Sequence, residues 1–218
     1  MKKIIDKALF IYNKCRKANS SFPIVFIKYL YYWLVYNKKI MAHQNTLING
    51  VEKIKINGDL NIGVEYVGFS KKSDVTMLNV QGELSFKKGY SIGRGCIFDI
   101  GENAVVQFGK GGYITANSRF IIMNKLIIGD DCAISWDCEF LDNDFHQISY
   151  ENKKIRPKEI VIGNHVWIGA GVKVYQGTTI ADGCVIASNA VVRGVFLEKN
   201  TIIGGNPARV IKHNVNWS

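Results

Sequence analysis

Hydrophobic residues recur at every sixth position through most of this chain. Six consecutive blocks open on an aliphatic residue, at positions 162, 168, 174, 180, 186 and 192. A second frame runs from Ile56 to Phe140, with lapses at Gly68, Asp74 and Lys110. Most blocks carry another apolar residue at the fifth position, so two of every six side chains are expected to point inward. This spacing fits neither a helix of period 3.6 nor the alternation of antiparallel hairpins.

The pattern predicts a triangular solenoid of parallel strands. Each block forms one flat side and its corner, three blocks form a turn of about 18 residues, and successive turns stack about 4.8 Å apart. The fifth position holds large residues early, such as Leu84 and Phe120, and small ones late, such as Cys184 and Ala190. We therefore expect the N-terminal end of the solenoid to be the broader one.

The first 50 residues lie outside this pattern and predict helices. The initial segment is amphipathic, with cations such as Lys7 and Lys14 on its polar face, and the segment from Ile24 to Tyr36 is apolar on nearly all sides. The second segment either covers the wide end of the solenoid, the interpretation we prefer, or lies in a membrane interface. The predicted organisation is a helical leader over 1–50, a solenoid over 51–213 and a tail over 214–218.

A loop must interrupt the solenoid where its two frames fall out of step, between Phe140 and Ile162. Loops on a rigid scaffold often carry catalytic groups, and this one spans about 141–161. His146 lies in it, with Asp142 and Asp144 just before. An imidazole there can remove a proton from a hydroxyl while a nearby carboxylate fixes its tautomer. The alternative is a solvated loop whose histidine has no role.

The net charge of +10, from 28 Lys and Arg against 18 Asp and Glu, suits an anionic ligand, a nucleic acid or a membrane surface. Part of it lies in the same loop, where Lys154 and Arg156, together with Asp142, are candidate substrate contacts. The other basic residues are scattered and form no aromatic-interleaved RNA motif, which disfavours nucleic acid. Near the N-terminus no uncharged apolar run approaches the roughly 20 residues of a spanning helix. We expect a cytoplasmic protein, with peripheral contact to the inner membrane face through residues 1–40 as an open alternative.

The cysteines follow the solenoid pattern. Cys96, Cys132, Cys138 and Cys184 all occupy the inward fifth position, and only Cys15 lies outside it. Cys132 and Cys138 could be read as zinc ligands, but they lack a second ligand pair. Core thiols, and no metal site, are the expectation.

These residues resemble the hexapeptide-repeat acyltransferases, which have a left-handed parallel β-helix, over roughly residues 56–213. The Asp-x-Asp-Phe-His-x-Ile sequence around His146, followed by Ile-Gly-Asn-His-Val-Trp-Ile-Gly ending at Gly169, is most similar to the polysaccharide and capsule O-acetyltransferases. The resemblance implies an all-β solenoid, a homotrimer, acetyl-CoA as the donor and a glycan hydroxyl as the acceptor. It also implies that His146 is the general base and that Trp167 lies near the thioester and the acceptor; Asp144 is the carboxylate we assign beside His146.

The resemblance further implies where CoA binds. In the family, CoA lies in a groove between adjacent trimer subunits, and the matching positions here are Gly169, Ala187 and Arg193. Arg193 departs from the Thr or Ser that many relatives carry. The tail from Ile203 to Lys212, with its Gly-Asn-Pro-Ala sequence, is typical of the family, and Arg209 and Lys212 are candidate partners of the CoA phosphates.

Two other functions stay open at this point. A small-sugar or xenobiotic acetyltransferase of the same fold shares the Val-Trp-Ile-Gly and Gly-Asn-Pro-Ala sequences. A non-catalytic β-helix protein with a binding or structural role is the alternative of another class.

Overall fold

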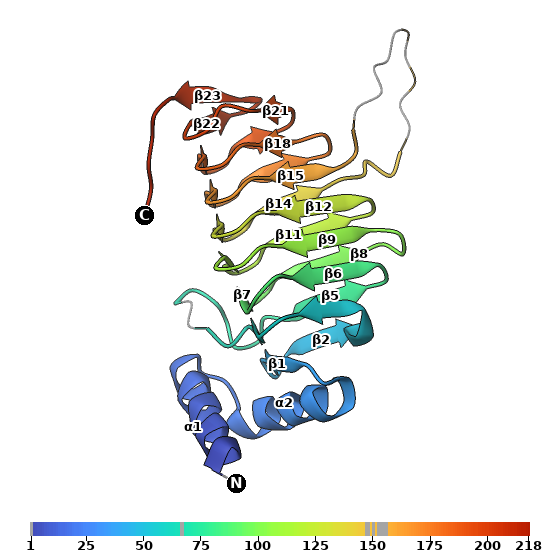
Figure 1. Ribbon diagram of the computed structural model, residues 1–218, viewed down its shortest axis with the longest axis vertical. Helices are drawn as coiled ribbons and strands as arrows, with labels where there is room; N and C mark the ends of the chain where they lie inside the picture. Colours follow the sequence, from blue (N-terminus) through green and yellow to red (C-terminus); the bar gives the residue numbers. More distant parts are fainter. Residues whose placement is uncertain (1, 66–67, 147–148, 150, 152–156) are drawn as a thin grey trace.

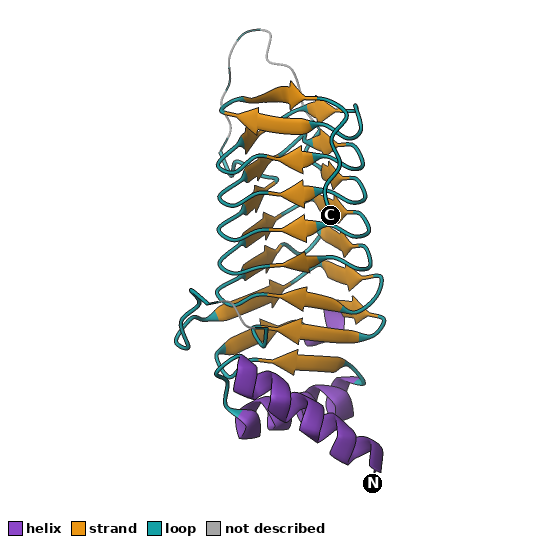
Figure 2. Ribbon diagram, turned by 90° about the vertical axis from the view of Figure 1, so that its left-hand side faces the viewer, coloured by secondary structure: helices purple, strands orange, loops and turns teal. Residues whose placement is uncertain are grey.

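The computed structural model describes residues 2–65, 68–146, 149, 151 and 157–218. Two helices, α1 (Lys2–Lys17) and α2 (Phe22–Tyr36), stand at one end of a long three-sided solenoid, and a short 3-10 helix (Val51–Lys53) precedes its third strand (Figures 1 and 2). The strands pass in turn through three sheets, which we call A, B and C, so that each strand of the parallel stack pairs with the third strand after it. A six-residue pattern produces this arrangement because each block supplies one side of the triangle.

Sheet A contains β1 (Lys39–Ala42), β4 (Asp59–Ile62), β7 (Tyr90–Ile92), β10 (Tyr113–Ile114), β13 (Ala133–Ile134), β16 (Trp167–Ile168), β19 (Val185–Ile186), β22 (Ile202–Gly205) and β23 (Ala208–Lys212). Sheet B contains β2 (Thr46–Asn49), β5 (Thr76–Val80), β8 (Ile97–Ile100), β11 (Arg119–Ile122), β14 (Glu139–Leu141), β17 (Lys173–Tyr175) and β20 (Val191–Val192). Sheet C contains β3 (Ile54–Ile56), β6 (Glu83–Phe86), β9 (Val105–Phe108), β12 (Lys125–Ile128), β15 (Ile160–Ile162), β18 (Thr179–Ile180) and β21 (Val195–Phe196). The printed pairings are parallel except for β23, which folds back antiparallel on β22.

The turns of the solenoid are longer at its N-terminal end than the predicted 18 residues. Ile92 pairs with Ile114, 22 residues further on, whereas Ile168 pairs with Ile186, 18 residues further on. The early strands are longer because they enclose aromatic side chains: the rings of Phe98, Phe120 and Phe140 stack in register, with centroids 4.5 and 4.7 Å apart. In the later turns Val174 and Val192 occupy the same inward position. The N-terminal end is therefore the broader one, as expected.

The solenoid begins earlier than the boundary at residue 51 that the pattern indicated. β1 pairs with β4, and β2 pairs with β5, so the first turn starts at Lys39. This turn escapes the six-residue pattern because a second excursion, between Ile62 and Thr76, follows it and separates it from the regular blocks. Residues 1–50 are thus two helices plus the first two strands.

The inner face of α2 covers the broad end of the solenoid. Tyr32 joins the main hydrophobic core, and Val25 and Tyr29 pack with residues of α1 and β1 in a second buried cluster. The ammonium group of Lys28 donates to the carbonyl oxygens of His43, Gln44 and Thr46, at 2.8 to 3.2 Å. Among the described residues, no helix is long and apolar enough to cross a membrane.

Arg94 fixes the helical end to the solenoid from inside. Its side chain is only 4% exposed, and its guanidinium donates to the carbonyl oxygens of Gly63 and Ala18 and to the hydroxyl of Ser20. The corner between α1 and α2 is therefore tied to the second and third turns by a buried charge whose donors meet carbonyl and hydroxyl oxygens.

The five cysteines are buried, unpaired thiols. Burial raises the pKa of Cys132 and Cys138 to about 11 and that of Cys96 to about 12. At neutral pH these groups are protonated, so they are poor nucleophiles and poor metal ligands.

Candidate functional site

The predicted loop projects from the corner between sheets B and C. It leaves at the end of β14 and returns at β15, as the trace at the upper right of Figure 1 illustrates. Lys154 and Arg156, the predicted substrate contacts, lie outside the described residues. The loop's described beginning, from Asp142 to His146, is where the candidate chemistry can be examined.

Asp142 forms the root of the loop rather than a surface for substrate. Its carboxylate is fully buried and accepts three backbone N–H bonds, from Met123 at 2.7 Å, Asn124 at 2.7 Å and Lys125 at 2.8 Å. These bonds tie the loop to the turn before β12. Because the carboxylate is buried and already hydrogen-bonded, this geometry argues against its assignment as a substrate contact.

His146 is exposed, and its Nδ1 lies 3.3 Å from the carbonyl oxygen of Asp144. A carbonyl oxygen can only accept a hydrogen bond, so this contact favours the tautomer with hydrogen on Nδ1. That tautomer leaves the lone pair of Nε2 available as a proton acceptor. The geometry differs from the sequence interpretation in one respect: the imidazole contacts the backbone of Asp144, not its carboxylate.

The carboxylate of Asp144 faces the turns above the loop. It pairs with the guanidinium of Arg193 at 3.3 Å and accepts a hydrogen bond from the side-chain amide of Gln176. The same guanidinium lies 5.6 Å from the ring centroid of Tyr175. Sequence reasoning missed Gln176 and Tyr175, although the pairing of Leu141 with Tyr175 places them one turn beyond the loop.

Trp167 lies in sheet A, within an aromatic cluster. Its indole is 42% exposed and donates to the hydroxyl of Ser135 at 3.2 Å. The ring of Trp217, in the C-terminal segment, lies 6.2 Å away and stacks on His165 with centroids 4.2 Å apart. Trp217 and His165 also exchange two hydrogen bonds between rings and backbone oxygens, at 3.0 and 3.1 Å. The C-terminal segment thus returns along the solenoid to this cluster (Figure 1).

The remaining candidate CoA contacts fall at two places. Gly169 and Ala187 follow β16 and β19 at the corner between sheets A and B, where a Cβ on Gly169 would lie 2.6 Å from the carbonyl oxygen of Ile186. Arg209 and Lys212 are exposed on β23, at the C-terminal end of the solenoid. Arg193 is separate from both groups, because it belongs to the loop corner.

One chain therefore brings together His146, Asp144 and Arg193, but not Trp167. The loop rises from the corner between sheets B and C, and in a three-sided solenoid this corner lies opposite sheet A, which carries Trp167. The catalytic candidates lie on two different sides of the molecule. A site that uses both His146 and Trp167 needs a second copy of the chain.

Comparison with known proteins gives consistent matches. The family model for the bacterial transferase hexapeptide, six repeats, matches residues 159–194. The chain is 36% identical to an uncharacterized 24.8 kDa protein in the cps region of Klebsiella pneumoniae, over 99% of this chain and 97% of that protein. It is 28% identical over 142 residues to the Escherichia coli K12 protein WbbJ, described as a lipopolysaccharide biosynthesis O-acetyl transferase, covering 60% of this chain and 72% of WbbJ.

The fold also has a solved counterpart. The crystal structure of the polysialic acid O-acetyltransferase OatWY superposes with a TM-score of 0.55 at 23% identity, covering 82% of this chain and 90% of that one. The solenoid is thus the left-handed parallel β-helix of hexapeptide-repeat proteins, with N-terminal helices added, which confirms the predicted fold.

Proposed function

Because the chain belongs to the hexapeptide-repeat acyltransferase family, we propose that it transfers an acetyl group from acetyl-CoA to a hydroxyl of a bacterial surface polysaccharide or its precursor. The observation that carries this proposal is the contact between Nδ1 of His146 and the carbonyl oxygen of Asp144, which leaves Nε2 free on an exposed loop. The names of the relatives support the reaction class: two of them are O-acetyltransferases that act in lipopolysaccharide biosynthesis and on polysialic acid.

The proposed reaction is a direct transfer. Nε2 of His146 takes the proton of the acceptor hydroxyl as its oxygen attacks the thioester carbonyl. A backbone N–H of the solenoid stabilises the oxyanion of the tetrahedral intermediate. When this intermediate collapses, the C–S bond breaks and the CoA sulfur receives the proton from His146. A covalent acyl-cysteine is disfavoured because all five thiols are buried.

We propose that the active unit is a homotrimer with its sites between subunits. The loop of one copy would meet sheet A of the next, and His146 and Trp167 would then face the same groove. The opposite placement of these two residues in one chain supports this arrangement. A heterologous interface repeated by a three-fold axis closes into a ring with three equivalent sites.

The CoA molecule is proposed to lie along that groove. Gly169 and Ala187 leave room for the pantetheine arm, and Arg209 and Lys212 on β23 are exposed cations for the phosphates. Arg193 is ion-paired to Asp144, so we place it beside the catalytic loop rather than among the phosphate contacts. Lys154 and Arg156 remain proposed contacts to the acceptor.

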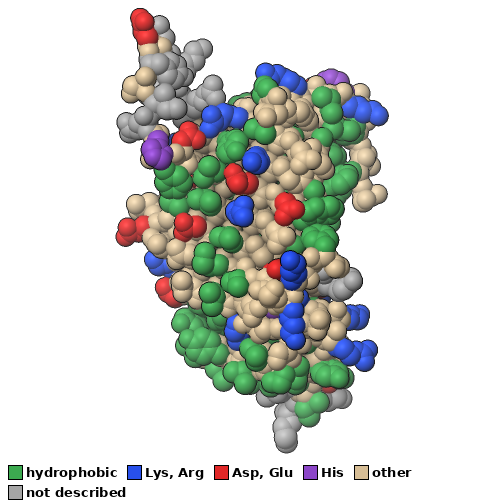
Figure 3. Space-filling model, turned by 180° about the vertical axis from the view of Figure 1, so that it is seen from behind, with side chains coloured by type: hydrophobic (Ala, Val, Ile, Leu, Met, Phe, Trp, Pro, Cys, Tyr) green, Lys and Arg blue, Asp and Glu red, His purple; other side chains and the backbone are tan. Residues whose placement is uncertain are grey.

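The helical end is proposed to rest on the inner face of the membrane. While one face of α2 is buried, its opposite face exposes Ile24, Ile27, Tyr31, Leu34 and Val35, which are 45 to 72% exposed. Figure 3 shows hydrophobic side chains gathered over this end of the molecule. Tyr, Trp and apolar side chains favour the membrane interface. Liposome sedimentation tests this: the I27E/L34E double variant should stay in the supernatant when the wild type sediments, and equal sedimentation would reject the contact.

Acceptor-stimulated release of the CoA thiol tests the enzymatic proposal. Purified protein with acetyl-CoA should release thiol faster when a surface polysaccharide is added, and mass spectrometry should find the acetyl group on the glycan. Stimulation by small sugars or drugs alone would favour the small-molecule alternative. If no glycan, sugar or drug stimulates release, the chain is a non-catalytic β-helix protein.

A further inference from the structure

The outer face of sheet A carries a column of side chains that runs away from Trp167 toward the helical end. The printed register stacks Trp167 on Ala133, Ala133 on Tyr113, Tyr113 on Ser91 and Ser91 on Asn61. Trp167 and Tyr113 are 42% and 49% exposed, while Ala133 between them has no bulk. From Trp167 to Ser91 the column covers three strand spacings, about 14 Å.

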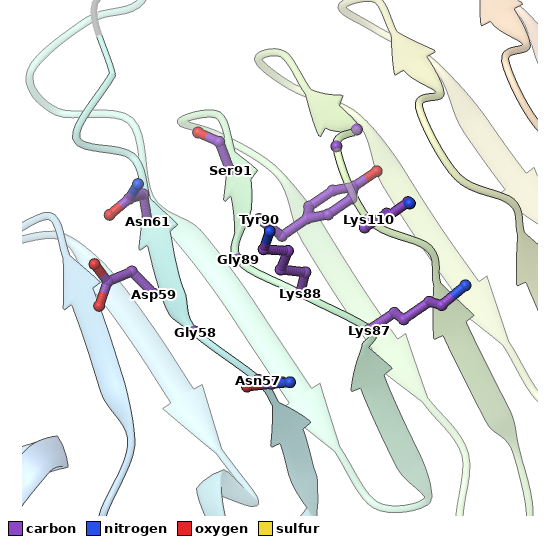
Figure 4. Close-up of a pocket in the computed structure, with 12 residues that line it drawn as sticks. Asn57, Gly58, Asp59, Asn61, Lys87, Lys88, Gly89, Tyr90, Ser91 and Lys110 are labelled. Atoms are coloured by element: carbon purple, nitrogen blue, oxygen red, sulfur yellow. The ribbon is translucent and has the colours of Figure 1, made fainter.

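A pocket opens at the foot of this column (Figure 4). Its volume is about 690 Å³, and it follows the corner between sheets C and A across three consecutive turns of the solenoid. Ser91 and Asn61 of the column belong to its wall. The lining residues are Asn57, Gly58, Asp59, Asn61, Lys87, Lys88, Gly89, Tyr90, Ser91, Lys110, Gly111 and Gly112.

The wall of the pocket is positively charged on balance. Three lysines line it, Lys87, Lys88 and Lys110, against one carboxylate, Asp59. Asp59 is already paired with the ammonium group of Lys7 at 3.0 Å. Just outside the wall, Asp130 holds Lys87 at 3.2 Å and Lys110 at 4.0 Å.

Lys88 differs from its two neighbours, because it has no ion-pair partner among the described residues. Asp130 orients the other two lysines without neutralising all three. The pocket therefore offers fixed cations and one unpaired ammonium group to an incoming anion.

Two buried polar atoms in the wall also have unused hydrogen-bonding capacity. The hydroxyl of Tyr90, a side chain only 3% exposed, and the amide oxygen of Asn61 have no hydrogen-bond partner within the described part of the chain. The glycines at the corners keep the backbone bare: a Cβ on Gly112 would lie 2.8 Å from the Tyr90 hydroxyl. Buried polar groups without partners in a folded protein point to a missing ligand or solvent.

We propose that this pocket, which we call the lysine pocket, is an acceptor subsite for an anionic group of the glycan, a carboxylate or a phosphate. Trp167 would lie at the hydroxyl that reacts, and the exposed ring of Tyr113 would pack against the sugar between the two places. The inference rests on the proposed function and deepens it, because it assigns an acidic or phosphate-bearing acceptor of several sugar residues. The pocket lies on the side of Trp167 away from β23, where the CoA phosphates are proposed to bind.

Fluorescence anisotropy without acetyl-CoA tests the subsite separately from catalysis. The probes are a labelled uronic-acid oligosaccharide, a labelled neutral oligosaccharide of equal length and a labelled alkyl glycosyl pyrophosphate. The variants are Lys88→Gln/Lys110→Gln, Tyr113→Ala and, as the control, Arg119→Gln. Arg119 is an exposed cation on sheet B, outside the pocket.

The double lysine variant should bind one anionic probe roughly tenfold more weakly, since two charge-assisted contacts are lost, and the neutral probe as before. Tyr113→Ala should weaken all probes that bind, and Arg119→Gln should change none by more than about twofold. The anionic probe that is affected identifies the group as carboxylate or phosphate.

The subsite is rejected if the double variant binds both anionic probes as tightly as the wild type. It is also rejected if the wild type releases thiol with a glycan yet binds neither anionic probe; the proposed function would then stand. Binding of an anionic probe that needs both lysines, without thiol release by any glycan, would support the subsite and reject the transfer reaction.

Discussion

Nδ1 of His146 contacts the carbonyl oxygen of Asp144 at 3.3 Å, while the carboxylate of the same aspartate pairs with Arg193. The backbone of Asp144 thus orients the base, and its side chain holds the loop to the neighbouring turns. This division separates two roles that a carboxylate beside a catalytic histidine usually combines.

Replacing Asp144 by Asn should therefore be far milder than replacing His146. Asp144→Asn keeps the carbonyl oxygen and loses only an exposed ion pair, so kcat should fall less than about tenfold. The pH at which kcat is half-maximal on the acid side should not move. A steady-state pH profile checks this, with Arg193→Gln as the matched change on the other partner. A loss of the size seen on removing His146, with a shifted profile, would restore the carboxylate as the orienting group.

Mixed trimers test whether the site lies between subunits. His146→Ala and Trp167→Ala should each be poorly active alone, the first by orders of magnitude and the second by roughly tenfold. Co-expressed and purified together, they should regain about a quarter of wild-type activity, because one in four interfaces pairs an intact histidine with an intact tryptophan. Activity no higher than the mean of the two single variants would place both residues in one subunit's site.

Asp142 should matter for stability because of its buried position. Asp142→Asn replaces a carboxylate that accepts three backbone N–H bonds by a group with one acceptor oxygen. We expect the free energy of unfolding to fall by roughly 3 kcal/mol, measured by urea denaturation. Asp144→Asn, at an exposed position in the same loop, is the control and should change it by less than about 1 kcal/mol. Equal stabilities would show that the bonds at Asp142 are dispensable.

His43 should make the protein sensitive to acid. It is fully buried beneath the helices, and burial, together with the charges of Arg94 and Lys28, lowers its pKa to about 4. The unfolded chain has a histidine pKa near 6.5, so it binds the proton first as the pH falls. The contribution of His43 is complete above pH 6.5, declines as the pH falls toward 4 and is level below that.

This contribution can be isolated by a variant that cannot take up the proton. Between pH 7 and 4.5 we expect the wild type to lose roughly 2 kcal/mol more stability than His43→Gln. Urea denaturation at both pH values measures the difference. Parallel losses in the two proteins would show that His43 does not carry the acid sensitivity.

The sequence pattern was sufficient for the solenoid because the six-residue period reports directly which side chains point inward. It failed for the length of the early turns, where four-residue strands around the Phe98, Phe120 and Phe140 stack exceed the period. The first turn was missed for a related reason: the excursion after β4 hides its relation to the regular blocks. Period alone does not encode how wide the core is.

The candidate site was only partly predictable. A histidine in a break of the repeat is visible in the sequence, but whether it contacts a carboxylate or a carbonyl depends on the loop's path. Asp142 and Asp144 are equivalent on spacing, and only the structure separates the buried root from the exposed surface pair. Trp217 carried no signal, since a tail residue has no period to relate it to His165.

The most direct test of the central claim is the acceptor-dependent rate of thiol release by His146→Ala. If His146 is the base, kcat should fall by about 10² to 10⁴, while CoA binding, measured by calorimetry, stays within about twofold of wild type. His213→Ala, which removes an exposed histidine paired with Glu198 at the far end, is the control and should keep wild-type kcat. A His146→Ala protein that turns over at the wild-type rate would contradict the account.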